Sequence, residues 1–177
     1  MIRKVAEALD HLSKVSVAHG NLSLNSIVFA RKDPNQIKLV DPCLAFNESQ
    51  ASQSFDFSPF SIPAWVTPDF AKDEINKAAE EKDDVYALGA LAYELYLGQQ
   101  PHMTTETSSI MKARRDGEAP SEESGNSDFD EFIKACLAKD RSQRSTLQDL
   151  LQTKFITESA SESSASSWKN LIENNED

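Results

Sequence analysis

The feature that most constrains this fold is the stretch of residues 84–95 (DVYALGALAYEL), which is apolar on almost every side. A helix with one apolar stripe can lie on a surface, but a helix that is apolar all round must be covered by other elements. Gly98 and Pro101 follow it, and these residue types commonly end helices. The sequence therefore predicts a buried central helix, with the rest of the chain packed around it.

Residues 2–15 are predicted to form an amphipathic helix, because apolar residues recur there at helical spacing between charged ones. The residues of this stripe are Ile2, Val5, Leu9, Leu12 and Val15.

A small β-hairpin is predicted next. Residues 27–30 (IVFA) and 37–40 (IKLV) are short apolar runs of the kind that form strands. Asp33, Pro34 and Asn35 lie between them, and these residue types favour turns. We therefore expect two antiparallel strands joined at this turn.

Three further segments complete the predicted domain. Residues 105–115 are expected to form a short exposed helix. A second helix is predicted because five apolar residues recur at helical spacing: Phe129, Phe132, Ile133, Cys136 and Leu137. A last helix, with a capping box from Ser145 and Gln148, carries Leu147, Leu150, Leu151 and Phe155. The predicted domain covers residues 1–156, and residues 157–177, rich in Ser, Glu and Asn, are expected to be a disordered acidic tail.

Composition excludes several functions. The 177 residues contain 18 Lys and Arg against 29 Asp and Glu, and the net charge of −11 argues against nucleic acid as a partner. No run approaches the roughly 18 apolar residues of a membrane span. Cys43 and Cys136 form no disulfide framework, and with His11, His19 and His102 scattered no metal site is predicted. We expect a cytoplasmic, intracellular protein.

Two motifs flank the predicted hairpin. The run HGNLSLNS, residues 19–26, resembles the kinase catalytic loop H-R-D-L-x-x-x-N. In this run Gly20 replaces the Arg, Asn21 the catalytic Asp, and Ser26 the metal-binding Asn. Asp41 follows the second strand and resembles the Asp of the magnesium-binding D-F-G.

Three later motifs extend this resemblance. Residues 61–69 (SIPAWVTPD) resemble G-T-x-x-Y-x-A-P-E, residues 84–95 resemble D-x-W-S-L-G-x-x-x-Y-E-L, and residues 136–145 (CLAKDRSQRS) resemble C-L-x-x-D-P-x-x-R-P. The resemblance implies the C-terminal lobe of the protein kinase family, a mostly α (α+β) helical bundle with a small β-hairpin at the catalytic loop. The combined pattern is most similar to the pseudokinase domain of the Janus kinases.

The parts of a kinase that form its small N-terminal lobe are not found in the sequence. There is no G-x-G for a phosphate-covering loop, and no V-A-I-K precedes the helix at residues 2–15. Lys38 lies on the strand that leads into Asp41, so it is not the ATP lysine. We therefore expect the N-lobe to be absent, and Met1 to be an internal methionine of a longer kinase or the start of a shortened product.

The resemblance implies a site without functional catalytic residues. Phosphoryl transfer needs an Asp that orients the substrate hydroxyl and an Asp and Asn that hold the metal. Asn21 cannot accept a proton as a carboxylate does, and Ser26 is a shorter metal ligand than Asn. Ser23 also replaces the lysine of the catalytic loop. We expect no cofactor, or at most weak binding of ATP and magnesium through Asp41.

Other motif residues are expected to be structural. His19 is interpreted as a buried residue bonded to the backbone, not as a proton donor. Asp84 is either the N-cap of its helix or, as the resemblance implies, a partner of the loop backbone. Asp69 and Arg144 resemble the buried Glu–Arg pair of kinases. Gly20 replaces the Arg that receives an activation-loop phosphate, so we expect that switch to be lost.

Three functions remain open from the sequence. The favoured hypothesis is a catalytically inactive pseudokinase that binds a protein partner, such as an active kinase or an N-lobe in trans, as a scaffold or allosteric regulator. The second is a weakly active Ser/Thr-type kinase whose N-lobe lies upstream. The third is a structural subunit of a larger assembly.

Overall fold

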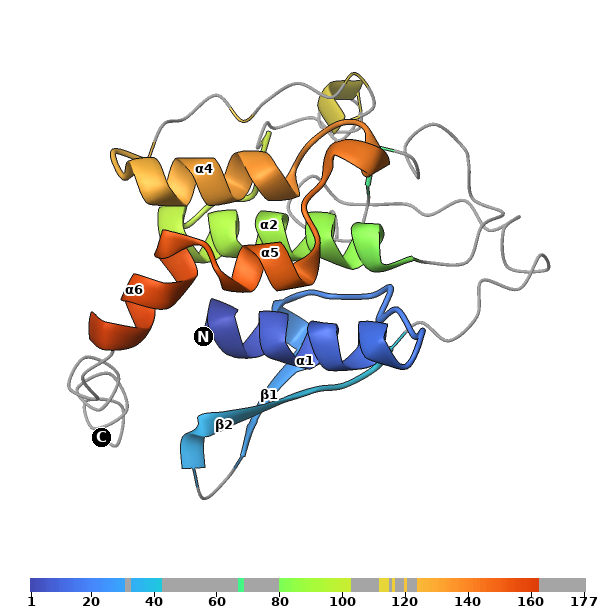
Figure 1. Ribbon diagram of the computed structural model, residues 1–177, viewed down its shortest axis with the longest axis vertical. Coiled ribbons are helices and arrows are strands. Elements are labelled where there is room, and N and C mark those ends of the chain that lie inside the picture. The colour runs from blue at the N-terminus through green and yellow to red at the C-terminus, as the bar shows by residue number, and fades with distance from the viewer. Residues whose placement is uncertain are drawn as a thin grey trace.

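The computed structural model describes residues 1–30, 33–42, 67–68, 80–102, 112–114, 116, 120 and 124–162, without the side chains of residues 33–35 and 159–162. Figure 1 shows how the elements are arranged. In chain order they are α1 (Ile2–Lys14), η1 (Leu24–Ser26), β1 (Ile27–Ala30), β2 (Asp33–Leu39), α2 (Glu81–Leu97), α4 (Ser127–Cys136), η3 (Arg141–Gln143), α5 (Leu147–Leu151) and α6 (Lys154–Glu162).

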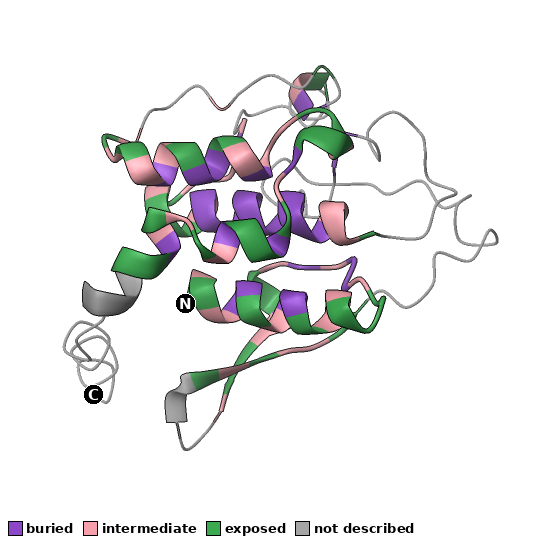
Figure 2. Cartoon of the chain, viewed as in Figure 1, coloured by how far each residue is buried: buried purple, intermediate pink, exposed green. Residues whose placement is uncertain are grey.

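Helix α2 is the centre of the fold, as predicted. Every residue from Asp84 to Tyr93 is buried, because α4 covers one side of the helix while α1 and α5 cover others (Figures 1 and 2). Gly98 ends the helix with φ of 74°, and its N–H donates to the carbonyl of Glu94 at 2.9 Å. Glycine suits this left-handed cap because it has no Cβ to clash.

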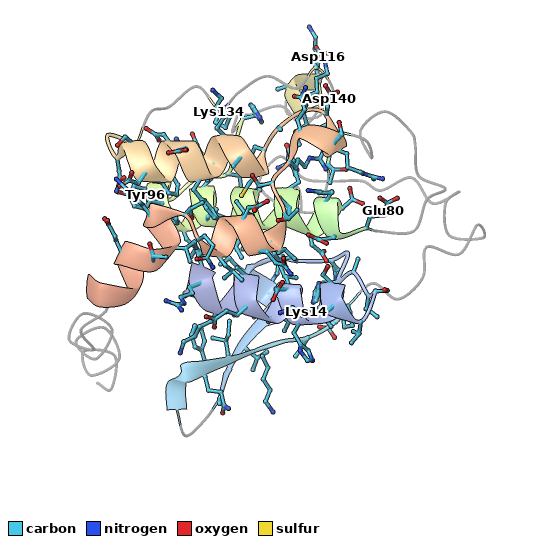
Figure 3. All side chains as sticks on the ribbon, in the orientation of Figure 1. Lys14, Glu80, Tyr96, Asp116, Lys134 and Asp140 are labelled. Atoms are coloured by element: carbon cyan, nitrogen blue, oxygen red, sulfur yellow. The ribbon has the colours of Figure 1, made fainter. Side chains whose placement is uncertain are left out.

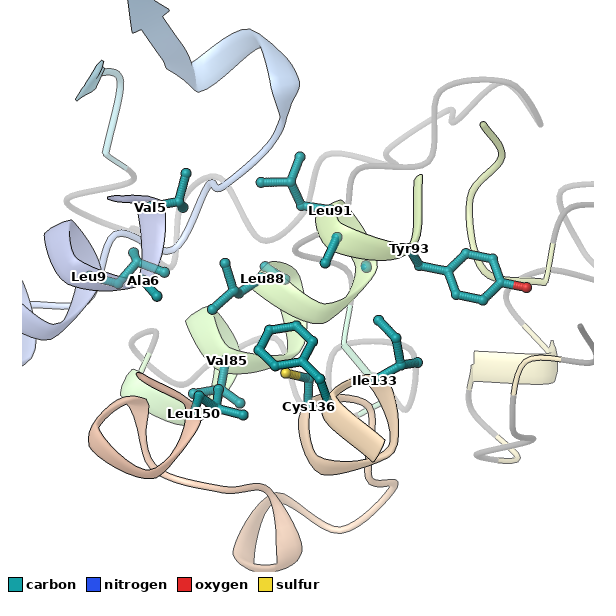
Figure 4. Close-up of a cluster of buried hydrophobic side chains, with 14 of the residues drawn as sticks. Val5, Ala6, Leu9, Val85, Leu88, Leu91, Tyr93, Ile133, Cys136 and Leu150 are labelled. Carbon is teal, nitrogen blue, oxygen red and sulfur yellow. The ribbon is translucent and has the colours of Figure 1, made fainter. Parts of the chain in front are cut away.

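Helix α1 presents Val5, Ala6 and Leu9 to the core, where Figure 4 shows them facing Leu88 of α2. The prediction was wrong for Val15, which is 59% exposed. The helix ends at Lys14, before this residue, and the chain turns away from the core.

Helices α2 and α4 approach closely at Gly89. A Cβ atom at this position would lie 2.4 Å from the Cβ of Cys136, so no larger residue fits without moving one helix. The stripe predicted for α4 is buried at Phe129, Phe132 and Ile133 as well as at Cys136. The Asn126 side chain caps α4 by accepting from the N–H groups of its first turn.

The C-terminal segment forms two short helices where one was predicted. The cap of α5 is Thr146, one residue later than expected: its hydroxyl accepts the N–H of Asp149 at 3.1 Å. Phe155 lies on α6, with its ring 5.0 Å from that of Phe129 in an edge-to-face contact. Helix α6 continues to Glu162, so helix covers the start of the segment expected to be disordered.

The two strands form one antiparallel sheet, in which Ile27 pairs with Leu39 and Phe29 with Ile37. The turn was predicted wrongly. Ala30 pairs with Asp33, so the strand already includes Asp33–Asn35, and the register shifts between Phe29 and Ala30. Pro34 has no N–H to give to a regular ladder, which explains why the irregularity lies at this point.

Among the described residues, no helix is both long and apolar enough to cross a membrane.

Candidate functional site

The candidate site is the loop between α1 and β1 together with the end of β2. The loop begins where α1 closes: the N–H of Ser16 donates to Ser13 at 2.8 Å, and the N–H of Val17 donates to Leu12 at 3.0 Å. Ser16 is left-handed, with φ of 57°. These two bonds form the Schellman arrangement, which reverses the chain after a helix.

His19 is 1% exposed and uses both ring nitrogens inside the protein. Its Nδ1 accepts the N–H of Asn21 at 3.3 Å, and its Nε2 lies 3.1 Å from the carbonyl oxygen of Val40. Because Nδ1 accepts, Nε2 carries the proton and donates it to Val40. Burial lowers the pKa of His19, although the Val40 carbonyl and Asp41 act to raise it. His19 is therefore a neutral structural link between the loop and β2.

Asp84 holds the loop against α2. Its carboxylate accepts the N–H of His19 at 2.6 Å and that of Gly20 at 2.8 Å. The contact implied by the family resemblance is thus present, and the N-cap of α2 is Glu80. Burial raises the pKa of Asp84 to about 6, although both N–H groups act to lower it. Gly20 has φ of 68°, a conformation that costs a glycine little.

Asn21 and Asp41 meet through the backbone. The Asn21 side-chain amide donates to the main-chain carbonyl of Asp41 at 3.0 Å. Asp41 is exposed and left-handed, with φ of 56°. The Asn21 side chain therefore acts as a hydrogen-bond donor to the chain itself.

Ser26 is 2% exposed, and its hydroxyl closes the turn at η1. It donates to the carbonyl of Ser23 at 2.9 Å and accepts the Ser23 N–H at 2.9 Å. The backbone of Ser26 also accepts the N–H of Val40 at 2.9 Å, which starts the sheet. A hydroxyl engaged in this way is turned inward, toward its own loop.

These contacts limit the chemistry of the site. Magnesium prefers several oxygen ligands in octahedral geometry, but the motif positions offer one carboxylate, that of Asp41, while the Ser26 hydroxyl is already bonded to Ser23. The described residues contain no cluster of three or more His, Cys, Asp or Glu side chains that could hold a metal. The described donor set at the motif positions therefore does not fit an octahedral magnesium site.

Arg144 is 2% exposed and ties the C-terminal segment to α2. Its Nε donates to the carbonyl of Ala138 and its Nη1 to that of Lys82, both at 3.0 Å. Its guanidinium carbon lies 5.0 Å from the centre of the Tyr86 ring. The predicted partner, Asp69, lies outside the described residues, so that pair stays a prediction.

The contacts made by the acidic residues at the start of α2 were not predicted from the sequence. Glu81 accepts the hydroxyl of Ser13 at 2.6 Å and the N–H of Leu147 at 3.2 Å, which links α1, α2 and α5. Arg141 lies 2.9 Å from Asp83 and 3.1 Å from Glu80, whose position at the start of α2 is marked in Figure 3. The run of acids before an apolar helix was the available signal, because carboxylates favour helix N-termini.

Arg114 is an exception to the exposed helix predicted for residues 105–115, of which residues 105–111 and 115 lie outside the described residues. Residues 112–114 are helical, but Arg114 is 1% exposed. Burial lowers the pKa of its guanidinium, while Tyr86 and Glu94 of α2 act to raise it. Arginine has a long apolar stem, so it can occupy a core position that a count of apolar residues does not reveal.

The fold and the loop together define a domain of the protein kinase type, mostly helical with a small two-stranded antiparallel sheet. The sequence model for protein tyrosine and serine/threonine kinases matches residues 1–154. The chain therefore belongs to the protein tyrosine and serine/threonine kinase family.

Individual relatives are distant. The probable serine/threonine-protein kinase mkcD of Dictyostelium discoideum is 26% identical over 159 residues, covering 88% of this chain and 23% of that protein. Serine/threonine-protein kinase KIC1 of Saccharomyces cerevisiae is 26% identical over 158 residues, covering 88% and 14%. Myosin-IIIa of Mus musculus is 26% identical over 163 residues, covering 89% and 10%. The chain spans less than a quarter of the length of these relatives.

Proposed function

We propose that this chain is a kinase-fold interaction module that does not transfer phosphate. The observation that carries the proposal is the bond from the Asn21 amide to the carbonyl of Asp41. In an active kinase this position supplies the carboxylate that accepts the substrate proton. Here the side chain of Asn21 is an amide, which cannot act as a general base, and its NH₂ group donates to the chain's own backbone. Loss of a general base lowers the rate of a reaction by about 10²–10⁴-fold.

Two neighbouring positions support the same conclusion. The Ser26 hydroxyl is bonded on both sides to Ser23. Gly20, at the position of the family arginine, contributes its N–H to Asp84 and no side chain to an incoming phosphate. Without the general base, the metal-binding Asn and the phosphate-binding Arg of the family, the chain would act through its surface, by binding another protein.

The finer assignment follows the family resemblance. In this assignment residues 1–156 form the large lobe, and the motif pattern, which resembles that of the Janus kinase pseudokinase domains, supports it. We propose an intracellular protein that acts as a scaffold or allosteric regulator. A small lobe or an active kinase bound in trans is the kind of partner that this lobe would accept.

A second candidate function is weak phosphoryl transfer by a Ser/Thr-type kinase. The names of two relatives favour it, since mkcD is called a probable serine/threonine-protein kinase and KIC1 a serine/threonine-protein kinase. The exposed Asp41 carboxylate also favours it, because this residue could bind a hydrated magnesium ion on a nucleotide.

Thermal unfolding of the full chain separates these candidates. A ligand that binds the folded state raises its stability by RT ln(1 + [L]/Kd). We expect no metal-dependent rise in Tm when ATP and Mg²⁺ or Mn²⁺ are added, and none for the matched variant Asp41→Asn. A rise that requires metal and disappears in Asp41→Asn would favour the second candidate. Mass measurement by size-exclusion chromatography in cell extract would identify a stoichiometric assembly.

A further inference from the structure

In the part of the chain that the structure describes, β1 is an edge strand of the two-stranded sheet, and the middle of the strand is exposed. β2 is the strand that packs against α1, whereas β1 contacts mainly β2, and the hairpin extends beyond α1 in Figure 1. Val28 is 45% exposed and Phe29 is 53% exposed. Because neighbouring side chains of a strand lie on opposite faces, β1 has one exposed side chain on each face at this point.

The register shows which backbone groups of β1 face away from β2. The N–H of Val40 donates to the carbonyl of Ser26, so Ser26 and Val40 form a hydrogen-bonded pair. Such pairs alternate along an antiparallel ladder. Val28 therefore bonds to Lys38, while the N–H and carbonyl of Phe29 point outward, away from Ile37.

Strand β1 itself carries none of the features that usually protect an edge against pairing with another strand. Proteins block such edges with charged residues, proline or a bulge on the edge strand. Here Lys38 and Pro34 lie on β2, and the extra residues of the irregular register lie on β2 as well. β1 itself is Ile-Val-Phe-Ala, a sequence of strong strand formers.

Size and charge together define the occupant. An edge of four residues is about 13 Å long, which suits a short extended segment and is too small for the roughly 800 Å² per partner of a stable interface between globular copies. Residues 27–38 contain Arg31, Lys32 and Lys38 against one acid, Asp33, in a chain of net charge −11. A segment with acidic residues is therefore the complementary one.

We infer that the outer edge of β1 is a docking site for a short extended segment of a partner protein, in which apolar and acidic residues alternate. The segment adds a third strand by bonding to the N–H and carbonyl of Phe29. Its apolar side chains lie on the face of Phe29 and Ile37, and its acidic side chains on the face of Val28 and Lys38. This inference rests on the proposed interaction function.

The test is amide NMR on the ¹⁵N-labelled full chain, titrated with a capped hexapeptide of alternating valine and glutamate. We expect saturable shifts confined to residues 27–30 and 37–39 and slower hydrogen exchange at the Phe29 amide. The same peptide with lysine in place of glutamate should bind about tenfold more weakly.

Variants locate the interaction. Lys38→Glu should abolish the preference for the glutamate peptide. Lys134→Glu, the matched control, changes the charge equally on the exposed face of α4, away from the hairpin (Figure 3), and should bind like the wild type. Phe29→Pro removes the outward N–H and should also abolish binding. If this variant unfolds the hairpin, the docking site is tested by the peptide preference of Lys38→Glu instead.

Four results would overturn the docking site: no saturable shift, shifts elsewhere, equal binding of both peptides, or an edge occupied by a second copy or by residues 163–177. A concentration-dependent sedimentation coefficient would reveal the second copy. None of these results touches the proposed function, which a phosphate-transfer assay tests separately.

Discussion

Two sets of motif side chains surround the same loop, and they differ in what they contact. His19, Asp84 and Arg144 are buried, and each joins segments that are far apart in the chain. The Asn21 side chain makes one bond, to the end of β2, and the Ser26 hydroxyl bonds within its own turn, to Ser23. The difference teaches that His19, Asp84 and Arg144 hold α2, the loop and the C-terminal segment together, whereas Asn21 and Ser26 fix the shape of the loop itself. The predictions below test this division.

The largest effect is expected for Arg144→Ala. The variant removes a buried guanidinium and leaves the carbonyls of Ala138 and Lys82 without their donor. We expect the free energy of unfolding, measured by urea denaturation, to fall by about 3–5 kcal/mol, because each of the two carbonyls left without a donor costs about 1–3 kcal/mol. Arg141→Ala, at a side chain that is 24% exposed, should cost about 1 kcal/mol or less. Equal losses for the two variants would contradict the structural role of Arg144.

The second prediction concerns pH and Asp84. Its folded pKa of about 6 lies above its ordinary value of 3.8, so its contribution to stability is present below about pH 4 and is lost as pH rises through about 6. Relative to Asp84→Asn, the wild type should lose about 3 kcal/mol between these limits. Chemical denaturation at several pH values measures the difference. A difference that does not change with pH would mean that the two N–H bonds balance the effect of burial and leave the pKa of Asp84 at its ordinary value.

Ser26→Ala tests the second set. If the hydroxyl serves the turn, its loss leaves the Ser23 N–H without an acceptor and should lower the free energy of unfolding by about 1–2 kcal/mol. Ser142→Ala, at an exposed serine of η3, is the matched control and should be neutral. Unchanged thermal unfolding of Ser26→Ala would show that the hydroxyl has no structural role.

The smallest effect is expected for Ser16→Gly, at the start of the loop. Ser16 is left-handed, and glycine adopts this conformation without steric cost, so the variant should be more stable by about 0.5–1 kcal/mol. Lys14→Gly, two residues earlier and still in the helix, should instead be destabilising by about 1 kcal/mol. Differential scanning calorimetry measures the stability of both variants. If both are less stable than the wild type, the helix end has been assigned to the wrong residue.

Periodicity predicted the helices well and their ends less well. The apolar positions of α2 and α4 followed directly from spacing, because these helices bury wide faces. The exposure of Val15 did not follow, since a helix that ends in a left-handed serine gives no glycine signal. The cap of α5 was predicted at Ser145 but is Thr146. Both residue types are good N-caps, so residue type alone does not distinguish the two positions.

The candidate site depended on resemblance more than on pattern. The contact of Asp84 with the loop joins residues 65 positions apart, and spacing alone cannot predict a bond of that range. The link from Ser13 through Glu81 to Leu147 has no motif and was missed. The bond of Asn21 to Asp41 needed the fold, because it depends on where the end of β2 returns beside the loop.

The most direct test of the central claim is transfer of labelled γ-phosphate from ATP by the full chain, to itself and to a general protein substrate, with Mg²⁺ or Mn²⁺. Asp41→Asn serves as the background, because it removes the one carboxylate available to hold a metal at the motif positions. The account predicts equal incorporation by the wild type and Asp41→Asn. Incorporation by the wild type that clearly exceeds this background would show that the altered loop still catalyses, and would contradict the account.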